Sequence, residues 1–271
     1  MKKIVLKTFF VIFGLYIVTL SLLYFNQEKM MFKPEKLDKN YAFKFEEPYN
    51  LTFEEFTIKS TDGILLNGLL FKVKNPKGLI FYLHGNGGSL RSFGKKGKTY
   101  VDLGYDVFIL DYRGYGKSEG RIYNNEEQLY QDNQIVYELL LKQYKEEEII
   151  VVGNFLGTGL ATKLASENNP KQLILLAPYY NFPDVAQSTY WFVPQFLVKY
   201  KFYTNKYLKE VKMPVVIFHG DKDDLIYHGS SLKLKKYFKP GDRLFTLEGG
   251  GHSKIENTKG FKNEIERILA K

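Results

Sequence analysis

The chain has 271 residues, of which 44% are hydrophobic and 25% are charged, and its formal net charge is +9. This size and composition suit one α/β domain of the larger kind. Because cysteine is absent, disulfides, thiolate metal sites and a cysteine nucleophile are excluded. The positive charge comes without a nucleic-acid recognition motif, so we expect a solvated lysine-rich surface and no nucleic-acid partner, with attraction to anionic lipid as the alternative.

Residues 1–26 are predicted to be a transmembrane anchor. Lys2, Lys3 and Lys7 precede an uncharged apolar run over residues 8–25, which would form about 27 Å of helix, close to the hydrocarbon thickness of a bilayer. A cleaved signal peptide is the alternative, although bulky residues stand where cleavage requires small ones. The lysines favour a cytoplasmic N-terminus, which makes this a single-pass membrane protein with its domain on the extracytoplasmic face.

After the anchor, residues 27–50 are polar and aromatic and are interpreted as a linker to a domain over residues 51–271. In that domain, short apolar runs alternate with longer segments of helical periodicity. We expect strands over residues 53–58, 64–73, 78–83, 106–110, 149–152, 173–176, 215–218 and 243–247, and helices over residues 89–103, 126–144, 156–166 and 260–269. The alternation predicts an α/β fold whose mostly parallel central sheet has helices on both faces and a mixed edge.

One aromatic stretch, residues 178–213, interrupts this alternation between two expected strands. We interpret it as a short cap over one end of the sheet that lines an apolar substrate pocket or touches lipid. An ordinary helical insertion that packs its own aromatic side chains is the alternative.

A strand, a tight turn and a helix are expected to meet around Phe155. Gly153 and Gly157 flank this residue in the arrangement G-x-S-x-G of a nucleophile elbow, whose central residue is an attacking serine. Small flanking residues are needed because the strained turn crowds the strand against the helix. Phenylalanine has no nucleophilic atom, and the positive φ of an elbow apex costs a bulky residue about 1–3 kcal/mol.

Three further patterns follow expected strands: a glycine-rich turn over residues 84–88, then Asp223, then His252. The carboxyl ends of parallel strands lie at one edge of an open sheet, where such folds build their sites. The chain order of elbow, acid and histidine is that of a serine hydrolase triad. Asp221 and Asp224 are the alternatives for the acid.

Taken together, these patterns resemble the single-domain, membrane-anchored α/β hydrolases of the serine aminopeptidase-like and depalmitoylase-like branch. The matching segments are residues 84–88, 111–120 and 156–159, His219-Gly220 with Asp223, and Gly251-His252. The resemblance runs from about residue 50 to the C-terminus. It implies an α/β-hydrolase fold, an oxyanion hole at the positions of Asn86 and Leu156, and no metal or organic cofactor; residues 111–120 are interpreted as structural.

Two functional hypotheses follow from Phe155 at the nucleophile position. In the first, the protein belongs with hydrolases of acyl esters, thioesters or peptides but is inactive or strongly impaired, because loss of a triad serine costs about 10⁶ in rate. In the second, it is a pseudoenzyme that binds an apolar ligand or a protein through its cap. A recent mutation fits the retained acid and imidazole, since one base change converts a serine codon to a phenylalanine codon. No oligomeric state is predicted.

Hydroxyl side chains near the motifs are candidates to replace the missing nucleophile. They are Ser89, Thr158 and Ser253. We interpret each as a cap or turn residue, and Thr158 is expected to point away from the apex. Water activated by His252 is a further, slow alternative.

Overall fold

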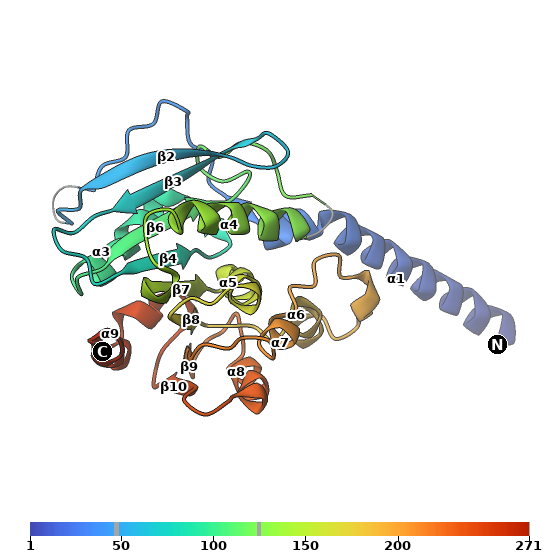
Figure 1. Cartoon of the computed structure of the whole chain (residues 1–271). Coiled ribbons are helices and arrows are strands. Elements are labelled where there is room, and N and C mark those ends of the chain that lie inside the picture. Colours follow the sequence, from blue (N-terminus) through green and yellow to red (C-terminus); the bar gives the residue numbers. More distant parts are fainter. Residues whose placement is uncertain (46–48, 124–125, 271) are drawn as a thin grey trace.

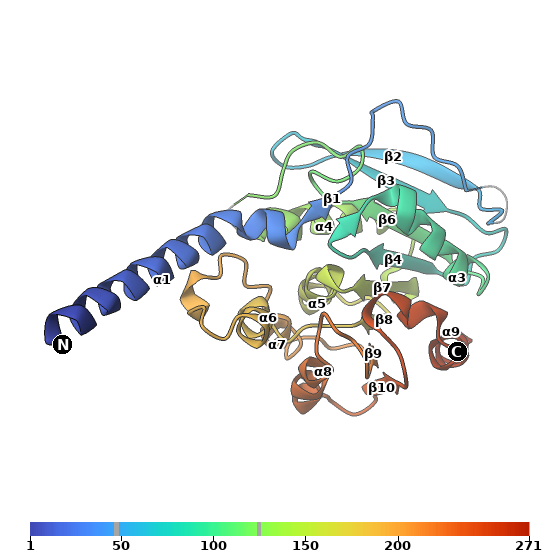
Figure 2. The ribbon, with the colours of Figure 1, turned by 180° about the vertical axis from the view of Figure 1, so that it is seen from behind.

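The computed structural model describes residues 1–45, 49–123 and 126–270, apart from the side chains of Ser253 and Lys254. A central sheet lies between two layers of helices, and a long N-terminal helix, α1 (Lys2–Met31), projects away from this body (Figure 1, Figure 2). The strands are β1 (Lys33–Pro34), β2 (Phe53–Lys59), β3 (Leu65–Phe71), β4 (Leu79–Leu83), β5 (Gly87–Gly88), β6 (Asp106–Asp111), β7 (Ile149–Asn154), β8 (Gln172–Leu176), β9 (Val215–Gly220) and β10 (Arg243–Leu247). The remaining α-helices are α2 (Leu90–Phe93), α3 (Gly97–Val101), α4 (Glu127–Leu140), α5 (Leu156–Glu167), α6 (Phe182–Thr189), α7 (Thr204–Tyr207), α8 (Gly229–Leu234) and α9 (Lys259–Leu269). Short 3-10 helices cover Gly94–Lys96, Glu146–Glu148, Gln195–Leu197, Lys235–Tyr237 and His252–Asn257.

Within the described residues, eight strands form the main sheet in the order β10-β9-β8-β7-β4-β6-β3-β2. The pairs β2–β3 and β3–β6 are antiparallel, and the other neighbouring pairs are parallel. The predicted mostly parallel α/β sheet, with an antiparallel hairpin at one edge, is therefore confirmed.

Successive residues of the central strands point to opposite faces of the sheet, as the two-residue period of a strand requires. On β7, Val151 packs in the same cluster as Leu160 of α5. Its neighbour Val152 packs with Tyr100 of α3 and Phe261 of α9 on the other face. Continuous apolar runs in the central strands follow from this burial on both faces.

The described part of residues 27–50 differs from the linker expected there. Helix α1 continues to Met31, and β1 pairs in parallel with β5. Phe32, Phe43 and Phe45 are buried, and the Phe45 ring lies 5.3 Å from that of Phe71. Irregularly spaced aromatic residues give no helix or strand period, so the sequence did not reveal this packing; residues 46–48 lie outside the described residues.

Two other elements also differ from expectation. The helix expected over residues 89–103 is divided into α2, a 3-10 turn and α3. A side chain at Gly94 would overlap the Phe45 ring, so the chain bends where the segment after α1 packs against it. Helix α8 was not expected. The helices between β8 and β9, α6 and α7, lie in the aromatic stretch interpreted as a cap.

Candidate active site

The turn between β7 and α5 carries Phe155 at its apex. Its φ and ψ are 45° and −106°, a region that residues other than glycine rarely adopt. The Phe155 N–H donates to the Leu176 carbonyl of β8 at 2.9 Å, and the Thr158 N–H donates to the Phe155 carbonyl at 2.9 Å. The apex therefore has the expected positive φ, and its main chain is held on both sides.

Glycine is required on each side of this apex. A Cβ atom on Gly153 would lie 2.6 Å from the Gly157 carbonyl oxygen, and one on Gly157 would overlap the Leu83 carbonyl of β4. Strand β7, helix α5 and strand β4 thus approach one another too closely for any side chain. This close approach is the physical reason for the Gly-x-x-x-Gly spacing read in the sequence.

Asp223 and His252 meet beyond the carboxyl ends of β9 and β10. The His252 Nδ1 atom lies 2.9 Å from Oδ2 of Asp223 and 3.1 Å from Oδ1. When Nδ1–H donates to the carboxylate, Nε2 is the nitrogen left to face a reacting group. The structure brings these two predicted residues together, whereas the alternative acids Asp221 and Asp224 are exposed.

The Asp223 carboxylate has donors beyond His252. Its Oδ1 accepts hydrogen bonds from the N–H groups of Leu225 at 3.0 Å and Ile226 at 2.8 Å, and His219 Nε2 lies 3.4 Å from Oδ2. Burial by itself raises the pKa of Asp223, but the hydrogen bonds from His219, His252 and Ile226 outweigh burial and hold this pKa well below its ordinary value of 3.8. The carboxylate is therefore ionised at neutral pH and can orient the imidazole.

The Phe155 ring stands edge-on against the His252 ring. The two ring centroids are 4.9 Å apart, with an angle of 87° between the planes. Tyr179 contacts the other side of Phe155 at 6.3 Å between centroids. Serine hydrolases hold a hydroxyl within hydrogen-bonding reach of the imidazole; here an aromatic ring without a donor or a nucleophilic atom lies against it.

Asn86 and Leu156 are the predicted oxyanion-hole positions. Asn86 lies in the glycine-rich turn after β4, and Leu156 directly follows Phe155. Leu156 is the first residue of α5, where an α-helix leaves its N–H groups without an intrahelical partner and the helix dipole is positive. Asn86 is held against helix α1, because its side-chain amide donates to the Met31 carbonyl at 2.8 Å. The Asn86 carbonyl in turn accepts a hydrogen bond from the Lys33 N–H at 2.9 Å.

Residues 111–120 support the turn that carries Asn86, in agreement with the structural interpretation of this segment. The Asp111 Oδ1 atom accepts from the Leu90 N–H at 2.9 Å. The Tyr115 hydroxyl donates to the Asn86 carbonyl at 2.7 Å. These contacts fix the main chain of the glycine-rich turn and of the helix that follows it.

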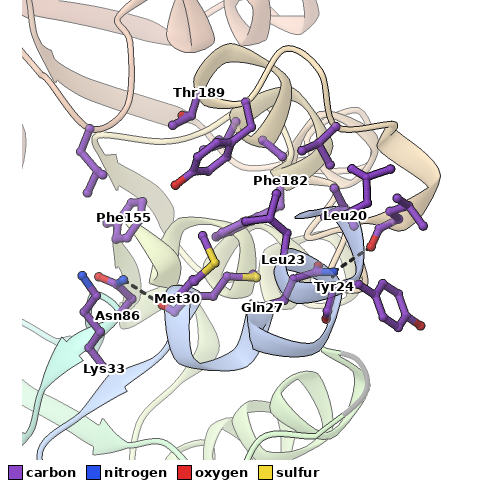
Figure 3. A pocket seen from close by; sticks show the side chains of 18 residues that line it. Leu20, Leu23, Tyr24, Gln27, Met30, Lys33, Asn86, Phe155, Phe182 and Thr189 are labelled. Atoms are coloured by element: carbon purple, nitrogen blue, oxygen red, sulfur yellow. Dashed lines mark hydrogen bonds between the residues drawn. The ribbon is translucent and has the colours of Figure 1, made fainter. Parts of the chain in front are cut away.

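Two cavities border Phe155. The first has a volume of about 300 Å³ and is lined mainly by apolar side chains of α1 and of the segment between β8 and β9. In Figure 3, Phe155 lies at one end of this cavity and Leu20 lies toward the other. The second cavity has a volume of about 280 Å³ and includes His252. Both are lined by Phe155 and Asn86, so the benzyl group stands at their common boundary.

The second cavity also holds charged residues that sequence reasoning missed. Lys96 Nζ lies 2.6 Å from Glu256 Oε2, and the Tyr82 hydroxyl donates to Glu256 Oε1 at 3.3 Å. Asn154 donates to the Tyr82 hydroxyl at 3.0 Å. The one signal in the sequence for Glu256 at this site is its position four residues after His252. Across the described residues, we find no cluster of three or more His, Asp or Glu side chains that could hold a metal ion.

Thr158 and Ser89, two of the candidate substitute nucleophiles, direct their hydroxyls to groups other than the imidazole. The Thr158 hydroxyl is buried and donates to the Phe155 carbonyl at 2.6 Å, and the Ser89 hydroxyl donates to Glu35 at 2.7 Å while capping α2. Both are therefore occupied by local hydrogen bonds, as interpreted from the sequence. The Ser253 side chain lies outside the described ones.

The topology and the turn between β7 and α5 define the class of protein as an α/β hydrolase. Over residues 74–209 the chain matches the family described as serine aminopeptidase, S33, and it belongs to that family. Its relatives include alpha/beta hydrolase domain-containing protein 17B of Homo sapiens, 29% identical over 208 residues that cover 72% of this chain and 67% of that protein. The Xenopus tropicalis protein of the same name is 29% identical over 194 residues, which cover 67% of this chain and 62% of the relative.

Solved structures of esterases share the fold. The esterase Pf2001 from Pyrococcus furiosus superposes with a TM-score of 0.70 at 17% identity, covering 89% of this chain and 97% of that one. The esterase EaEST from Exiguobacterium antarcticum superposes with a TM-score of 0.62 at 17% identity, covering 80% of this chain and 100% of that one. At this identity the likeness establishes the architecture, and the residues of the site must carry the chemistry.

Proposed function

We propose that this protein is a membrane-anchored member of the family in which hydrolysis of acyl esters, thioesters or peptides is lost or strongly reduced because Phe155 replaces the attacking serine. The observation that carries the proposal is the edge-on contact of the Phe155 ring with His252, 4.9 Å between centroids. The ring occupies the space in which a serine hydroxyl and an acyl carbon would meet.

The retained groups define which step is missing. In a serine hydrolase the imidazole takes the hydroxyl proton as the oxygen attacks the acyl carbon, and the carboxylate holds the imidazole in the correct tautomer. In this chain Asp223 holds His252 through Nδ1, so a base is present with no hydroxyl to deprotonate. The N–H groups of Asn86 and Leu156 are proposed to stabilise the oxyanion once a nucleophile is supplied.

Contacts of α1 support an uncleaved anchor. The helix is long and apolar enough to cross a membrane, by length and composition, and none of its residues is fully buried. Its C-terminal turns hydrogen-bond to the cap, residues 178–213, through Gln27. The Tyr16 hydroxyl donates to the Phe192 carbonyl of the cap at 2.9 Å, and cleavage near residue 26 would remove this contact. With Lys2, Lys3 and Lys7 in the cytoplasm, the domain would lie on the extracytoplasmic face.

A fluorophosphonate probe tests the proposal, because it labels only an activated nucleophile. We expect no labelling of the unmodified protein and clear labelling of Phe155→Ser, with ester hydrolysis gained in parallel. The matched control is the double variant Phe155→Ser/His252→Ala, which keeps the new hydroxyl but removes its base and should lose the labelling. Labelling of the unmodified protein at any residue contradicts the loss of activity. A silent Phe155→Ser variant that is folded, or equal activity with and without His252, contradicts the assignment of the site.

Binding of an apolar ligand is the second candidate function. The 300 Å³ cavity beside Phe155 favours it, because its volume lies at the lower end of the range for small-molecule sites and most of its lining is apolar. Such a role needs no nucleophile. The two functions separate experimentally: a binding protein retains its ligand in the unmodified form, whereas hydrolysis appears only in Phe155→Ser.

A further inference from the structure

One face of the anchor helix is turned toward the cap. Tyr16, Leu20, Leu23, Gln27 and Met31 are partly buried, whereas most residues between them are exposed. Their spacing of three or four residues places them on one stripe of the helix. The stripe is about 22 Å long at the rise of an α-helix. Its N-terminal half lies inside the expected membrane segment, residues 8–25.

Hydrogen bonds fix the cap along this stripe. The Tyr16 hydroxyl donates to the Phe192 carbonyl at 2.9 Å. Gln27 donates to the Leu197 carbonyl at 2.8 Å and accepts from the Lys199 N–H at 2.8 Å. The contact at Tyr16 lies about 16 Å along the helix from the one at Gln27. The cap therefore lies along α1 as far as the expected membrane segment.

The cap has the composition of a segment that meets lipid. Residues 185–198 contain no charged side chain. Trp191 is 83% exposed and Phe196 is 81% exposed, although large aromatic residues generally lie buried in soluble domains. Aromatic side chains of this kind are enriched at membrane interfaces. The exposed rings therefore mark the cap face that we expect to lie in the bilayer surface.

The cavity between α1 and the cap extends from Leu20, inside the expected membrane segment, to Phe155. Leu20 and Leu23 line it from α1, and Val185 and Ala186 line it from α6. Among the described residues that line the cavity, Lys33 is the one with a charge, and Figure 3 places it beside Asn86 at the Phe155 end. The cavity is thus mostly apolar along its length, with the solvent-exposed Lys33 and the Asn86 amide at its Phe155 end.

We propose that the C-terminal half of α1 is a wall of a ligand site that takes one long-chain fatty acid from the bilayer. The hydrocarbon chain lies between α1 and α6, and the carboxylate lies at Lys33 and Asn86, next to Phe155. A chain would move from lipid to this cavity without crossing water, because Leu20 and Leu23, which line the cavity, lie inside the expected membrane segment. The anchor helix then selects the ligand as well as holding the domain on the membrane. This inference rests on the proposed anchoring of the protein but not on the chemistry at Phe155.

A photoreactive palmitic acid with a diazirine in the middle of its chain tests the site in full-length protein reconstituted in phosphatidylcholine nanodiscs. We expect crosslinks on the cavity-facing residues Phe182, Val185 and Ala186, displaced by excess palmitic acid. Hexadecanol, which lacks the carboxylate, should compete about tenfold less well, because a hydrogen bond from a cation to a charged acceptor is lost.

Matched variants of α1 separate the cavity from the lipid around the helix. Leu23→Trp should lower the crosslinking of α6 about tenfold, because the added ring overpacks the cavity. Leu22→Trp adds the same ring to an exposed position of α1 and should leave the yield within about twofold, as surface substitutions generally do. Leu20→Trp repeats the test on a second lining position, and thermal unfolding of each variant establishes that it is folded.

Three outcomes overturn the inference: no displaceable crosslink on α6, equal loss in Leu22→Trp and Leu23→Trp, or equal competition by hexadecanol and palmitic acid. Failure here differs from failure of the proposed function. The fluorophosphonate experiment depends on His252 and a serine at position 155, whereas this one uses the unmodified phenylalanine. Either experiment can fail while the other succeeds.

Discussion

At the scale of single residues, the neighbours of Asp223 hold its carboxyl group in the charged form. His252 lies 2.9 Å from Oδ2, and the Ile226 N–H donates to Oδ1 at 2.8 Å. These donors exist only in the folded chain, so the carboxylate prefers its charged form more strongly in the native than in the unfolded state. The pair therefore contributes to stability even where no reaction takes place.

We predict that Asp223→Asn lowers the free energy of unfolding by about 2 kcal/mol at pH 7, because hydrogen bonds to a charged acceptor are lost. The folded pKa lies below the ordinary value of 3.8, so this stabilisation is complete above that value and declines as the pH falls through it toward the folded pKa. Urea unfolding at neutral pH and at about pH 3 measures the difference.

The control for this prediction is Asp224→Asn, the neighbouring exposed carboxylate, which should change stability by no more than about 0.5 kcal/mol. A gap between wild type and Asp223→Asn that stays constant as the pH falls would show that the charge of Asp223 does not contribute.

At the scale of elements, the turn between β7 and α5 stores strain that its glycines make possible. Phe155 has a φ of 45°, and its ring is 6% exposed. Burial of the ring raises the free energy of unfolding, whereas strain of the backbone lowers it. The two contributions can be separated, because alanine removes the ring and keeps the strain, whereas glycine removes both.

We predict that Phe155→Gly is more stable than Phe155→Ala by about 1–2 kcal/mol, since glycine adopts positive φ without a steric penalty. Chemical denaturation of both variants provides the measurement. The order should reverse at Lys163 in the interior of α5, where alanine is favoured over glycine by about 1 kcal/mol. If alanine is equally stable or better at position 155, the turn is not strained.

The sequence predicted the sheet because its central strands are buried on both faces and read as short apolar runs, as at β7 and β8. It also indicated the elbow, since Gly153 and Gly157 report a close approach that no other residue allows. The stripe on α1 could not be predicted in the same way. When every residue of a helix is apolar, hydrophobic spacing does not distinguish the face that meets protein from the face that meets lipid. Within the stripe, Tyr16 and Gln27 carry the polar groups.

The position of Phe32 and Phe45 in the core was missed for a related reason. These residues follow α1 without a period of two or of three to four, so no regular element was expected there. Their burial depends on Gly94 and Phe71, which are distant in the chain. Contacts of this kind arise from tertiary packing, which local patterns do not specify.

At the scale of the whole molecule, hydrogen bonds join helix α1 both to the cap and to the hydrolase body. Helix α1 contacts the glycine-rich turn through Met31 and Asn86, and it contacts the cap through Gln27. Movement of the cap away from α1 would open the cavity that ends at Phe155. We therefore expect the hydrogen bonds of Gln27 to control the opening of this cavity.

The Lys199 amide provides a direct readout of this coupling, because its N–H donates to the Gln27 side chain at 2.8 Å. We predict that Gln27→Ala raises hydrogen exchange at Lys199 about tenfold, the effect of losing a hydrogen bond worth about 1.4 kcal/mol. Amides of β7 and β8 should exchange as in wild type. Asn26→Ala is the matched control, because the Asn26 amide donates within α1 itself, to the Leu22 carbonyl. If both variants leave Lys199 protected, the cap is held by its own packing, and α1 is then an anchor that does not control the opening of the cavity.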